Sequence, residues 1–529
     1  MNKISRFFRT ISHLKFIQVA YQFKYRIFKP KPLKYFEKTI GIPKSIRFFK
    51  IPSVSPVLRY SKNTYVFWFL NLEKKFENKI DWNFQDYGKL WNYNLQYLDF
   101  LKQEGITDDL KISLVKDLYR DLWEGNLLLE PYPASLRIMN MIRFLSNLKS
   151  HDSESKKLIK YLSAEVNYLS KNLEYHILAN HLMENAFALL MGGYFFENKD
   201  WAEVAEKLLN AEMEEQILND GAHFELSPMY HKIILFRVLE ALVYIPKEKH
   251  LYLLFQTKAD LMLSWLNAFS FQDGTVAHFN DSTEGIALST NELLKIGQSL
   301  GVSPKDNHQL KESGYRKFSL NNFELIADVH SISPSYQPGH AHADTFSFCL
   351  NYKGKPIIVD PGISTYNISP RRHWERSTNA HNTVVINDDN SAEVWAGFRV
   401  GRRLNVNIIE ENSKYVHAVH DGYKKQKIKV SRVFKVLEDR IEINDFLEIG
   451  SFNPKIQINF HFHPEIMINQ INDSVFKIGE FINMEFNGSA KQEIHEYEYC
   501  LGYNKSIQAK KISVTLFGNS FKSIIKENQ

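Results

Sequence analysis

The residues best suited to metal chemistry lie between positions 336 and 388. In GHAHAD, His340, His342 and Asp344 alternate with alanine after a Pro-Gly turn, and TFSFCL follows as a predicted strand. Successive side chains of a strand point to opposite faces, so we expect these three on one face. The pattern predicts two imidazoles side by side at the start of a strand.

Two further segments would bring more ligands to the same place. NYKGK predicts a hairpin turn, PIIVD predicts a partner strand ending at Asp360, and NAHNTVVIN places His381 at the start of another strand. His342, Asp360 and His381 then form a three-ligand set of the kind zinc accepts, with one position open. The alternative is a chance group of surface histidines in a polar loop. The combination of the three segments favours the metal site.

A second group of polar residues begins an otherwise apolar helix in ILANHLMENAFALL. Asn180, His181 and Glu184 are three and four positions apart, so they can share one helix face. Burying them costs several kcal/mol unless they are paired or face a cleft. The alternative is an ordinary helix start, with Asn180 as a cap and Glu184 favouring the dipole; it leaves His181 unexplained.

The third candidate is Tyr230, in ELSPMYHK. Ser227 and Pro228 predict a helix N-terminus, which places Tyr230 in the first turn. The positive end of a helix dipole would lower the pKa of a phenol modestly. The alternative is that Tyr230 packs in the core, as most tyrosines of amphipathic helices do.

These motifs carry a family resemblance. GHAHADTFSF, VDPG and AHNTVV resemble the β-domain signature of the heparinase II/III-like polysaccharide lyases, and NHLMEN and SPMYH resemble the helical-domain motifs of that family, in the same order. The resemblance covers most of the chain after about Asp86. It implies an α/α-toroid followed by an antiparallel β-sandwich, acting on uronic-acid glycans by β-elimination.

The resemblance also implies roles for the candidate residues. Tyr230 would be the acid toward the O4 leaving group and, for one uronate epimer, also the base; His181 or His340 would be the base for the other epimer. Asn180 and His181 would neutralise the substrate carboxylate, and Glu184 would orient His181 or balance charge. The divalent metal, which we expect to be zinc, would be structural because elimination needs no activated water.

Three other residues suggest contacts with an anionic substrate. Arg137 and Asn140 lie three positions apart on a predicted helix, and Arg137 could hold a carboxylate through two hydrogen bonds. Arg376 lies in RRHWERS, shortly before His381. A solvated basic loop is the alternative for that stretch.

The length and patterning of the chain define what must position these residues. A chain of 529 residues exceeds a single hydrophobic core. We expect a basic N-terminal helix and proline-rich connector over 1–84, an α/α-toroid over 85–310, and a β-sandwich of short alternating strands over 311–529. Helices are predicted to begin near Lys89, Thr107, Ser135, Ser155, Asn180, Trp201, Ser227, Lys249 and Thr290.

Composition limits the partners. A net charge of +6 suits acidic glycans and is far from a nucleic-acid-binding balance. No segment is apolar over a length that crosses a bilayer, and the N-terminus lacks a secretory signal pattern. Its basic, apolar helix could lie on an anionic membrane or pack on the toroid. We therefore expect the protein to act in the cytoplasm or at the inner-membrane surface, with the periplasm or cell envelope as the alternative.

Three functions remain open at this level. The first is a lyase on a uronate glycan, within surface-polysaccharide metabolism. The second is a uronyl C5-epimerase, which removes the same proton and returns it to the opposite face. The third is a non-catalytic glycan-binding protein of polysaccharide assembly, against which the set of His181, Tyr230 and His340 argues.

Overall fold

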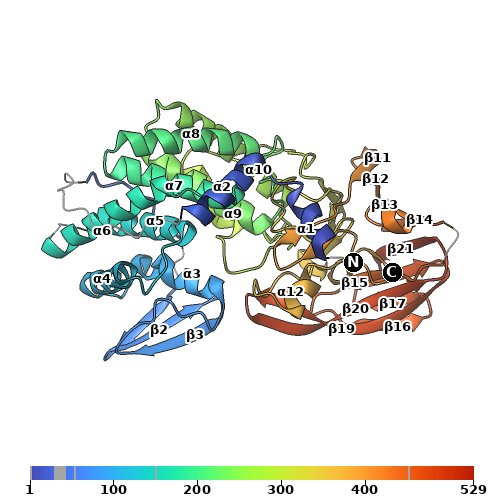
Figure 1. Ribbon diagram of the computed structural model, residues 1–529. Helices are drawn as coiled ribbons and strands as arrows, with labels where there is room; N and C mark the ends of the chain where they lie inside the picture. The colour runs from blue at the N-terminus through green and yellow to red at the C-terminus, as the bar shows by residue number, and fades with distance from the viewer. Residues whose placement is uncertain (1–2, 29–42, 53–54, 149–151, 451–452, 529) are drawn as a thin grey trace.

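The computed structural model describes residues 3–28, 43–52, 55–148, 152–450 and 453–528. A helical part and a strand-rich part lie side by side (Figure 1). Each has its own apolar core, one made largely of residues before 316 and one of residues from 318 onward. The predicted fold class, a toroid of helices followed by an antiparallel sandwich, is confirmed.

The helical part consists of antiparallel helices joined by short loops. Thr107 and Ser227 accept hydrogen bonds from the backbone N–H groups three residues on, which caps α4 and α9. The predicted helix starts all lie within about one turn of the observed ones. The helices are α3 (Lys89–Tyr97), α4 (Asp108–Glu124), α5 (Pro131–Asn147), α6 (Ser153–Lys171), α7 (Ala179–Phe195), α8 (Lys199–Gln216), α9 (Pro228–Tyr244), α10 (His250–Phe269) and α11 (Thr290–Ser299).

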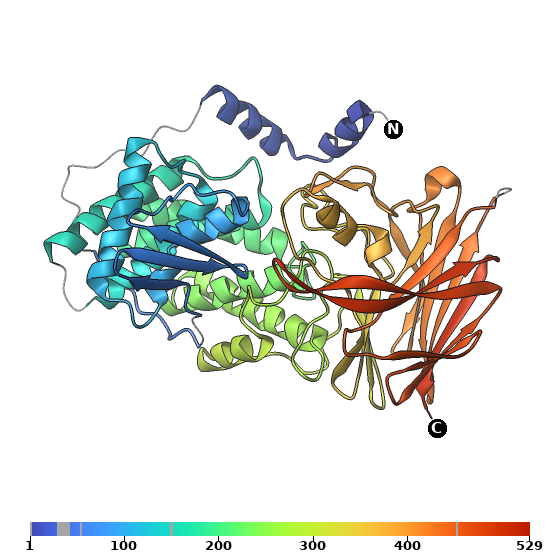
Figure 2. The same ribbon diagram turned by 90° about the horizontal axis from the view of Figure 1, so that it is seen from below.

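Two N-terminal features lie outside this toroid. A small antiparallel sheet of β1 (Leu58–Ser61), β2 (Thr64–Phe69) and β3 (Leu72–Glu77) packs Phe67 and Phe69 against Trp82 and Trp91. Helices α1 (Lys3–Ile11) and α2 (Phe16–Ile27) run across the outside of both parts (Figure 2). Within the described ranges, every helix is too short or too polar to span a bilayer.

The sandwich is built from antiparallel sheets. Its largest sheet has the order β11-β12-β13-β14-β21-β18-β17-β16, and two four-stranded sheets have the orders β19-β20-β15-β8 and β4-β5-β6-β7. The bounds are β4 (Tyr315–Leu320), β5 (Phe323–Asp328), β6 (Phe348–Tyr352), β7 (Lys355–Ile358), β8 (Val384–Ile386), β11 (Val406–Asn412), β12 (Tyr415–His420), β13 (Lys429–Val436), β14 (Arg440–Glu448), β15 (Ile456–His461), β16 (Ile468–Asn472), β17 (Val475–Ile478), β18 (Ile482–Asn487), β19 (Ala490–Gly502), β20 (Lys505–Leu516) and β21 (Ser520–Glu527).

The GHAHAD segment differs from its prediction. It is a loop, and the strand β6 begins only at Phe348. Its backbone bonds outside the sheet: the His340 carbonyl accepts from Asp281 N–H at 3.0 Å, and His342 N–H donates to Asn280 Oδ1 at 3.0 Å. Because the helical domain takes these groups, the segment cannot also join a strand ladder.

Candidate active site

Side chains from both domains meet at this loop. The rings of Tyr230, from α9, and His340 are 4.0 Å apart between centroids and inclined by 31°. Asn180, in the first turn of α7, places its amide nitrogen 3.3 Å from Nε2 of His340. The structure thus joins three of the five predicted catalytic residues at the domain boundary.

The loops that deliver these residues share a backbone feature. Leu178, Leu226, Asn280 and Phe346 have positive φ angles of 64°, 54°, 57° and 70°. Residues other than glycine rarely adopt this backbone conformation. Where they do, the surrounding structure holds them in it, often at functional sites. Each of them lies close in sequence to a residue of the cluster, which indicates that the cluster geometry is imposed by packing.

His340 is oriented by a buried carboxylate. Its Nδ1 lies 2.8 Å from Asp281 Oδ2, a contact that selects the tautomer with the proton on Nδ1 and the lone pair on Nε2. Arg372 donates to both Asp281 oxygens, at 2.5 and 2.7 Å, and Nε2 of His342 lies 2.9 Å from Oδ1. Burial opposes ionisation, but Arg372 and the two histidines hold the pKa of Asp281 well below its usual range.

Tyr230 is a buried phenol beside this base. Ser227 accepts from Tyr230 N–H at 3.3 Å and donates to the Asp281 carbonyl at 2.7 Å, which ties the start of α9 to the same loop. Tyr230 Oη lies 3.2 Å from Tyr366 Oη. The helix dipole was expected to lower the pKa of Tyr230; burial instead raises it well above its ordinary value. The phenol is therefore protonated at neutral pH.

His181 lies further along the first turn of α7. Its ring packs on Tyr132 with centroids 4.3 Å apart, and its Nδ1 is 3.2 Å from Glu174 Oε1. Burial lowers the pKa of His181, but Glu174, followed by Glu225, outweighs burial and raises it above the ordinary value. Its side chain keeps 29% exposure, enough to reach a ligand. Glu174 thus stabilises the cationic form of His181 at a partly open position.

Of the two roles expected of Glu184, orienting His181 or balancing charge, its contacts fit the second. The residue that hydrogen-bonds His181 is Glu174, whereas Glu184 is buried and accepts from Arg237 at 2.9 and 3.1 Å. Glu184 therefore balances the charge of Arg237, and the orientation of His181 belongs to Glu174.

Sequence comparison assigns the chain to a family. The signature described as Heparinase II/III N-terminus matches residues 60–306, and that described as Heparinase II/III-like, C-terminal matches residues 302–526. The chain belongs to the heparinase II/III-like family. Together the two signatures span both domains and every residue of the cluster.

Relatives and solved structures agree with this family. The chain is 23% identical to a heparin-sulfate lyase of Bacteroides stercoris, over 77% of this chain and 65% of that protein. It is 24% identical to a heparin-sulfate lyase of Pedobacter heparinus, over 58% of this chain and 49% of that protein. The chain thus spans less than two thirds of either relative.

The fold is similar to that of solved heparinases. A crystal structure of heparinase III has a TM-score of 0.65 at 16% identity, covering 85% of this chain and 79% of that one. A heparan sulfate lyase from Pedobacter heparinus has a TM-score of 0.56 at 16% identity, covering 97% and 88%. At this identity the likeness concerns the fold.

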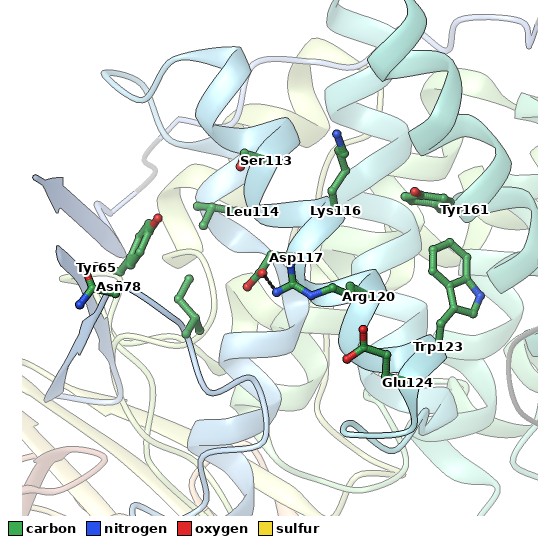
Figure 3. A pocket seen from close by; sticks show the side chains of 11 residues that line it. Tyr65, Asn78, Ser113, Leu114, Lys116, Asp117, Arg120, Trp123, Glu124 and Tyr161 are labelled. Atoms are coloured by element: carbon green, nitrogen blue, oxygen red, sulfur yellow. Dashed lines mark hydrogen bonds and ion pairs between the residues drawn. The ribbon is translucent and has the colours of Figure 1, made fainter. Parts of the chain in front are cut away.

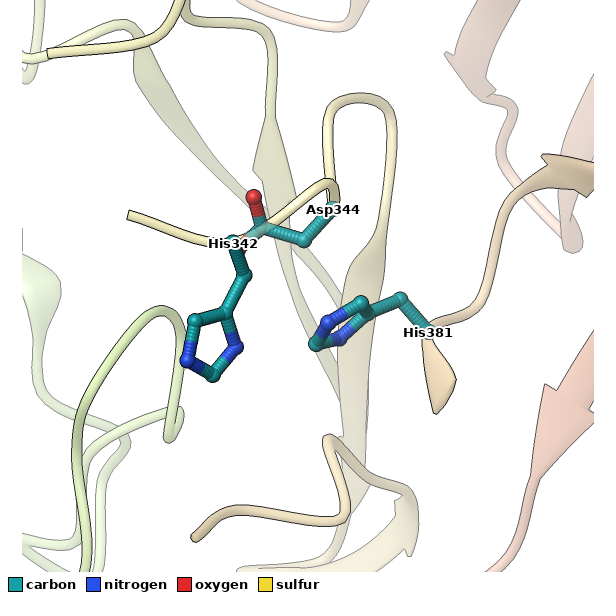
Figure 4. A group of neighbouring side chains, drawn as sticks. All are labelled: His342, Asp344 and His381. Atoms are coloured by element: carbon teal, nitrogen blue, oxygen red, sulfur yellow. The ribbon is translucent and has the colours of Figure 1, made fainter. Parts of the chain in front are cut away.

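A group of residues that could bind a metal lies next to His340, and its member His342 contacts the same carboxylate, Asp281. His342, Asp344 and His381 offer ligand atoms that lie within 4.8 Å of one another, and Figure 4 shows both imidazoles near Asp344. Nδ1 of His342, Oδ1 of Asp344 and Nε2 of His381 are buried and lack a hydrogen-bond partner in the part of the chain that the structure describes. Unpaired buried donors and acceptors are costly, so this heparinase II/III-like site fits a cation.

The predicted ligand Asp360 occupies a different place. Its Oδ2 lies 2.7 Å from Nδ1 of His381, the nitrogen that does not face the group. A carboxylate on the far nitrogen orients a metal-binding histidine and fixes its tautomer. Asp344 is the carboxylate that the structure brings beside both free nitrogens, and Asp360 as a direct ligand stays a prediction. Asp328 and His330 form a second such group with Asp344.

The predicted substrate contacts Arg137 and Arg376 require correction, because both side chains are buried. Arg137 is 0% exposed, and donates to Glu165 and to the Gln96 carbonyl. Arg376 donates to the Ala341 carbonyl at 2.8 Å, so it supports the GHAHAD loop. Neither guanidinium is open to a glycan. Burial depends on distant packing, so the i,i+3 spacing of a helix could not reveal it.

Asn140 remains partly accessible beside an aromatic surface. It donates to the Tyr97 carbonyl at 2.8 Å and to Asp99 at 2.9 Å. Tyr93, Tyr97 and Tyr132 gather next to it, with ring centroids 6.4–6.5 Å apart. Its role in substrate binding stays a prediction.

The structure adds Asp281, Glu225 and Tyr366 to the cluster. Arg372 lies in RRHWERS, the basic stretch expected near an anionic substrate, and it donates to Asp281 instead. Glu225 accepts from the Asn180 amide at 2.9 and 3.1 Å. Its position in HFELSP, just before Tyr230, was the available signal; nothing in the sequence marks Tyr366.

A separate hollow of about 500 Å³ lies between the small N-terminal sheet and helices α4 and α6. Figure 3 shows Asp117 and Arg120 paired within it, beside Trp123 and Tyr161. It contains none of the cluster residues. The hollow is therefore separate from the cluster at the domain boundary.

Proposed function

We propose that this chain is a polysaccharide lyase that cleaves a uronic-acid-containing glycan by β-elimination. The observation that carries the proposal is the contact between the Tyr230 ring and the His340 ring, with the lone pair of His340 Nε2 left beside the Asn180 amide. A base and an acid that act on neighbouring atoms of one sugar ring are required for this reaction. The relatives named as lyases support the reaction class.

The roles follow from the protonation states. His340 Nε2 takes the C5 proton, because Asp281 fixes the proton on Nδ1. Tyr230 stays protonated and donates to the O4 leaving group. Asn180 and cationic His181 stabilise the charge that develops on the uronate carboxylate. Once Tyr230 has lost its proton to O4, it would need to recover one from solvent or from Tyr366.

The same geometry argues against a C5-epimerase. Epimerisation needs a proton donor on the face opposite to the base. Tyr230 and His340 lie against each other, so both approach a bound ring from one side. An acid and a base on one side of the sugar ring suit elimination, so we propose a lyase acting on an acidic glycan.

We also propose a structural zinc ion and a cellular location. Two imidazoles and a carboxylate form a donor set that zinc accepts, and His342 and His381 would hold it with Asp344. An ion there would supply positive charge among buried carboxylates and stiffen the loop that carries His340. We place the work of the enzyme in the cytoplasm or at the inner-membrane surface, in making or trimming a surface polysaccharide.

The test is a panel of uronic-acid polysaccharides followed by the ultraviolet absorbance of the unsaturated product. Tyr230→Phe keeps the ring and removes one hydroxyl, and turnover should fall by roughly 100-fold or more. Tyr168→Phe is the matched control, because that hydroxyl donates to the Leu129 carbonyl within the toroid. Exchange of the C5 hydrogen in heavy water without an absorbance change would favour the epimerase.

A further inference from the structure

The two N-terminal helices attach to both domains through polar contacts. On α1, Arg9 donates to Glu393 at 2.7 and 2.9 Å, and Trp395 Nε1 donates to Thr10 at 3.2 Å. These partners belong to the strand-rich part. Helix α1 is therefore fixed to the sandwich by an ion pair and a hydrogen bond.

Helix α2 is fixed to the toroid and to the loop that leads to His340. Gln18 is fully buried and donates to the Ile177 carbonyl at 3.1 Å and to Gln337 at 3.4 Å. Tyr25 donates to the Leu173 carbonyl at 2.7 Å. Arg9, Gln18 and Tyr25 thus anchor the helix pair to the protein.

The apolar side chains of the pair face solvent. Phe16 is 86% exposed, Phe23 60% and Ile27 70%, and with Ala20 they recur at the spacing of one helix face. A surface helix normally buries such a face. We call the large exposed apolar residues of the two helices, together with the residue that follows α2, the outer stripe: Ile4, Phe7, Phe8, Phe16, Ile17, Phe23, Ile27 and Phe28.

The two helices that carry the outer stripe contribute charge of one sign, and the acidic partners Glu393 and Glu215 come from the body of the protein. The chain has no acidic residue before Glu37, and Lys24 and Arg26 are exposed next to the stripe. An apolar helix face flanked by lysine and arginine is typical of helices that lie in the interface of an anionic bilayer. A second copy of the pair would bring like charge against like charge, which disfavours a dimer through this surface.

We propose that α1 and α2 dock the folded enzyme on an anionic lipid surface through the outer stripe. The stripe enters the interface, and Lys24 and Arg26 meet the headgroups. Because Gln18 also bonds Gln337, three residues before His340, docking holds the loop that carries His340 at a fixed place near the bilayer. The proposal concerns a binding surface and stands whether or not the lyase activity does.

The test is co-sedimentation of the full chain with vesicles of phosphatidylcholine alone or mixed with phosphatidylglycerol. The wild type should bind the mixed vesicles, and high salt should weaken binding. A Phe16→Ser, Phe23→Ser, Ile27→Ser variant should lose at least about 10-fold in affinity. The matched control is Met467→Ser, Phe481→Ser, Phe517→Ser, which removes three large apolar side chains of 56–68% exposure from the sandwich and should bind normally.

A second variant keeps the test independent of folding. Lys24→Glu with Arg26→Glu leaves the apolar residues in place and should abolish the preference for anionic vesicles, with an unchanged melting temperature. Absence of wild-type binding to mixed vesicles, or equal binding to both vesicle types, would overturn the proposal. So would a wild-type dimer that the serine variant converts to a monomer, since that result assigns the stripe to a second copy.

Discussion

Two buried polar networks in this protein differ in how completely they are paired. In the toroid, Arg137 uses its guanidinium nitrogens on Glu165 and the Gln96 carbonyl, and the other Glu165 oxygen accepts from Tyr119. At the sandwich rim, His342 and His381 each keep a buried nitrogen without a partner among the described residues. The first network is closed and the second is open. An open network of buried donors and acceptors indicates a place for a ligand.

Among the single substitutions, the largest effect is expected from breaking the closed network. Arg137→Met removes a guanidinium and leaves Glu165 as an uncompensated buried charge, which should lower the free energy of unfolding by about 3–5 kcal/mol. KM for the glycan should not change. Denaturant unfolding measures the first quantity, and steady-state kinetics the second; a raised KM at unaltered stability would return Arg137 to substrate binding.

Removing the proposed cation should affect only the open network. Chelation should lower the free energy of unfolding by about 2.7 kcal/mol if the free metal stands near 100 times its dissociation constant. Asp344→Asn should abolish metal binding, measured by elemental analysis.

Asp360→Asn separates the two possible roles of that carboxylate. If Asp360 orients His381, the variant should weaken metal affinity by about 10–100-fold. Complete loss of metal in Asp360→Asn, with retention in Asp344→Asn, would make Asp360 the direct ligand. If chelation left the free energy of unfolding unchanged, the proposal of a structural metal would be wrong.

Acid should destabilise both regions through buried neutral histidines. Burial lowers the pKa of His231 in α9 to about 3, and that of His420 in β12 to about 3. Below pH 6.5 the unfolded chain protonates these rings while the folded chain does not. Stability is therefore complete above pH 6.5 and falls as pH drops toward 3, by about 1.4 kcal/mol per pH unit for each ring.

Chemical denaturation between pH 7 and pH 4 measures this slope. His420→Gln should reduce the dependence of stability on pH. Its effect on the free energy of unfolding at pH 7 should be smaller than the stability that it restores at pH 4. A slope that is the same in His420→Gln and wild type would show that other groups control acid unfolding.

The smallest effect is expected at Asn140. Asn140→Ala removes the hydrogen bonds to Tyr97 and Asp99, which should cost about 1 kcal/mol and leave KM unchanged if the residue is structural. A several-fold rise in KM with little loss of stability would instead make it a substrate contact, as the sequence predicts. The two measurements used for Arg137 distinguish these outcomes.

The sequence by itself determined the local features. Thr107 and Ser227 predicted helix starts because capping depends on residues one turn apart. The alternation of β-branched residues after Tyr315 predicted strands for the same reason, since the period of side chains is local. The motifs around His340, His342 and His381 also identified the family, because their residue types follow one another closely.

Tertiary structure alone decided which of these residues act together. Asn180 and His340 are 160 positions apart, and only the packing of two separate cores brings them within 3.3 Å. It also turned GHAHAD into a loop, by giving its backbone partners in another domain. Burial set the pKa of Tyr230 against the expected dipole effect, and it enclosed Arg137. The burial of a side chain depends on contacts with residues far away in the sequence, so no local pattern of residues predicts it.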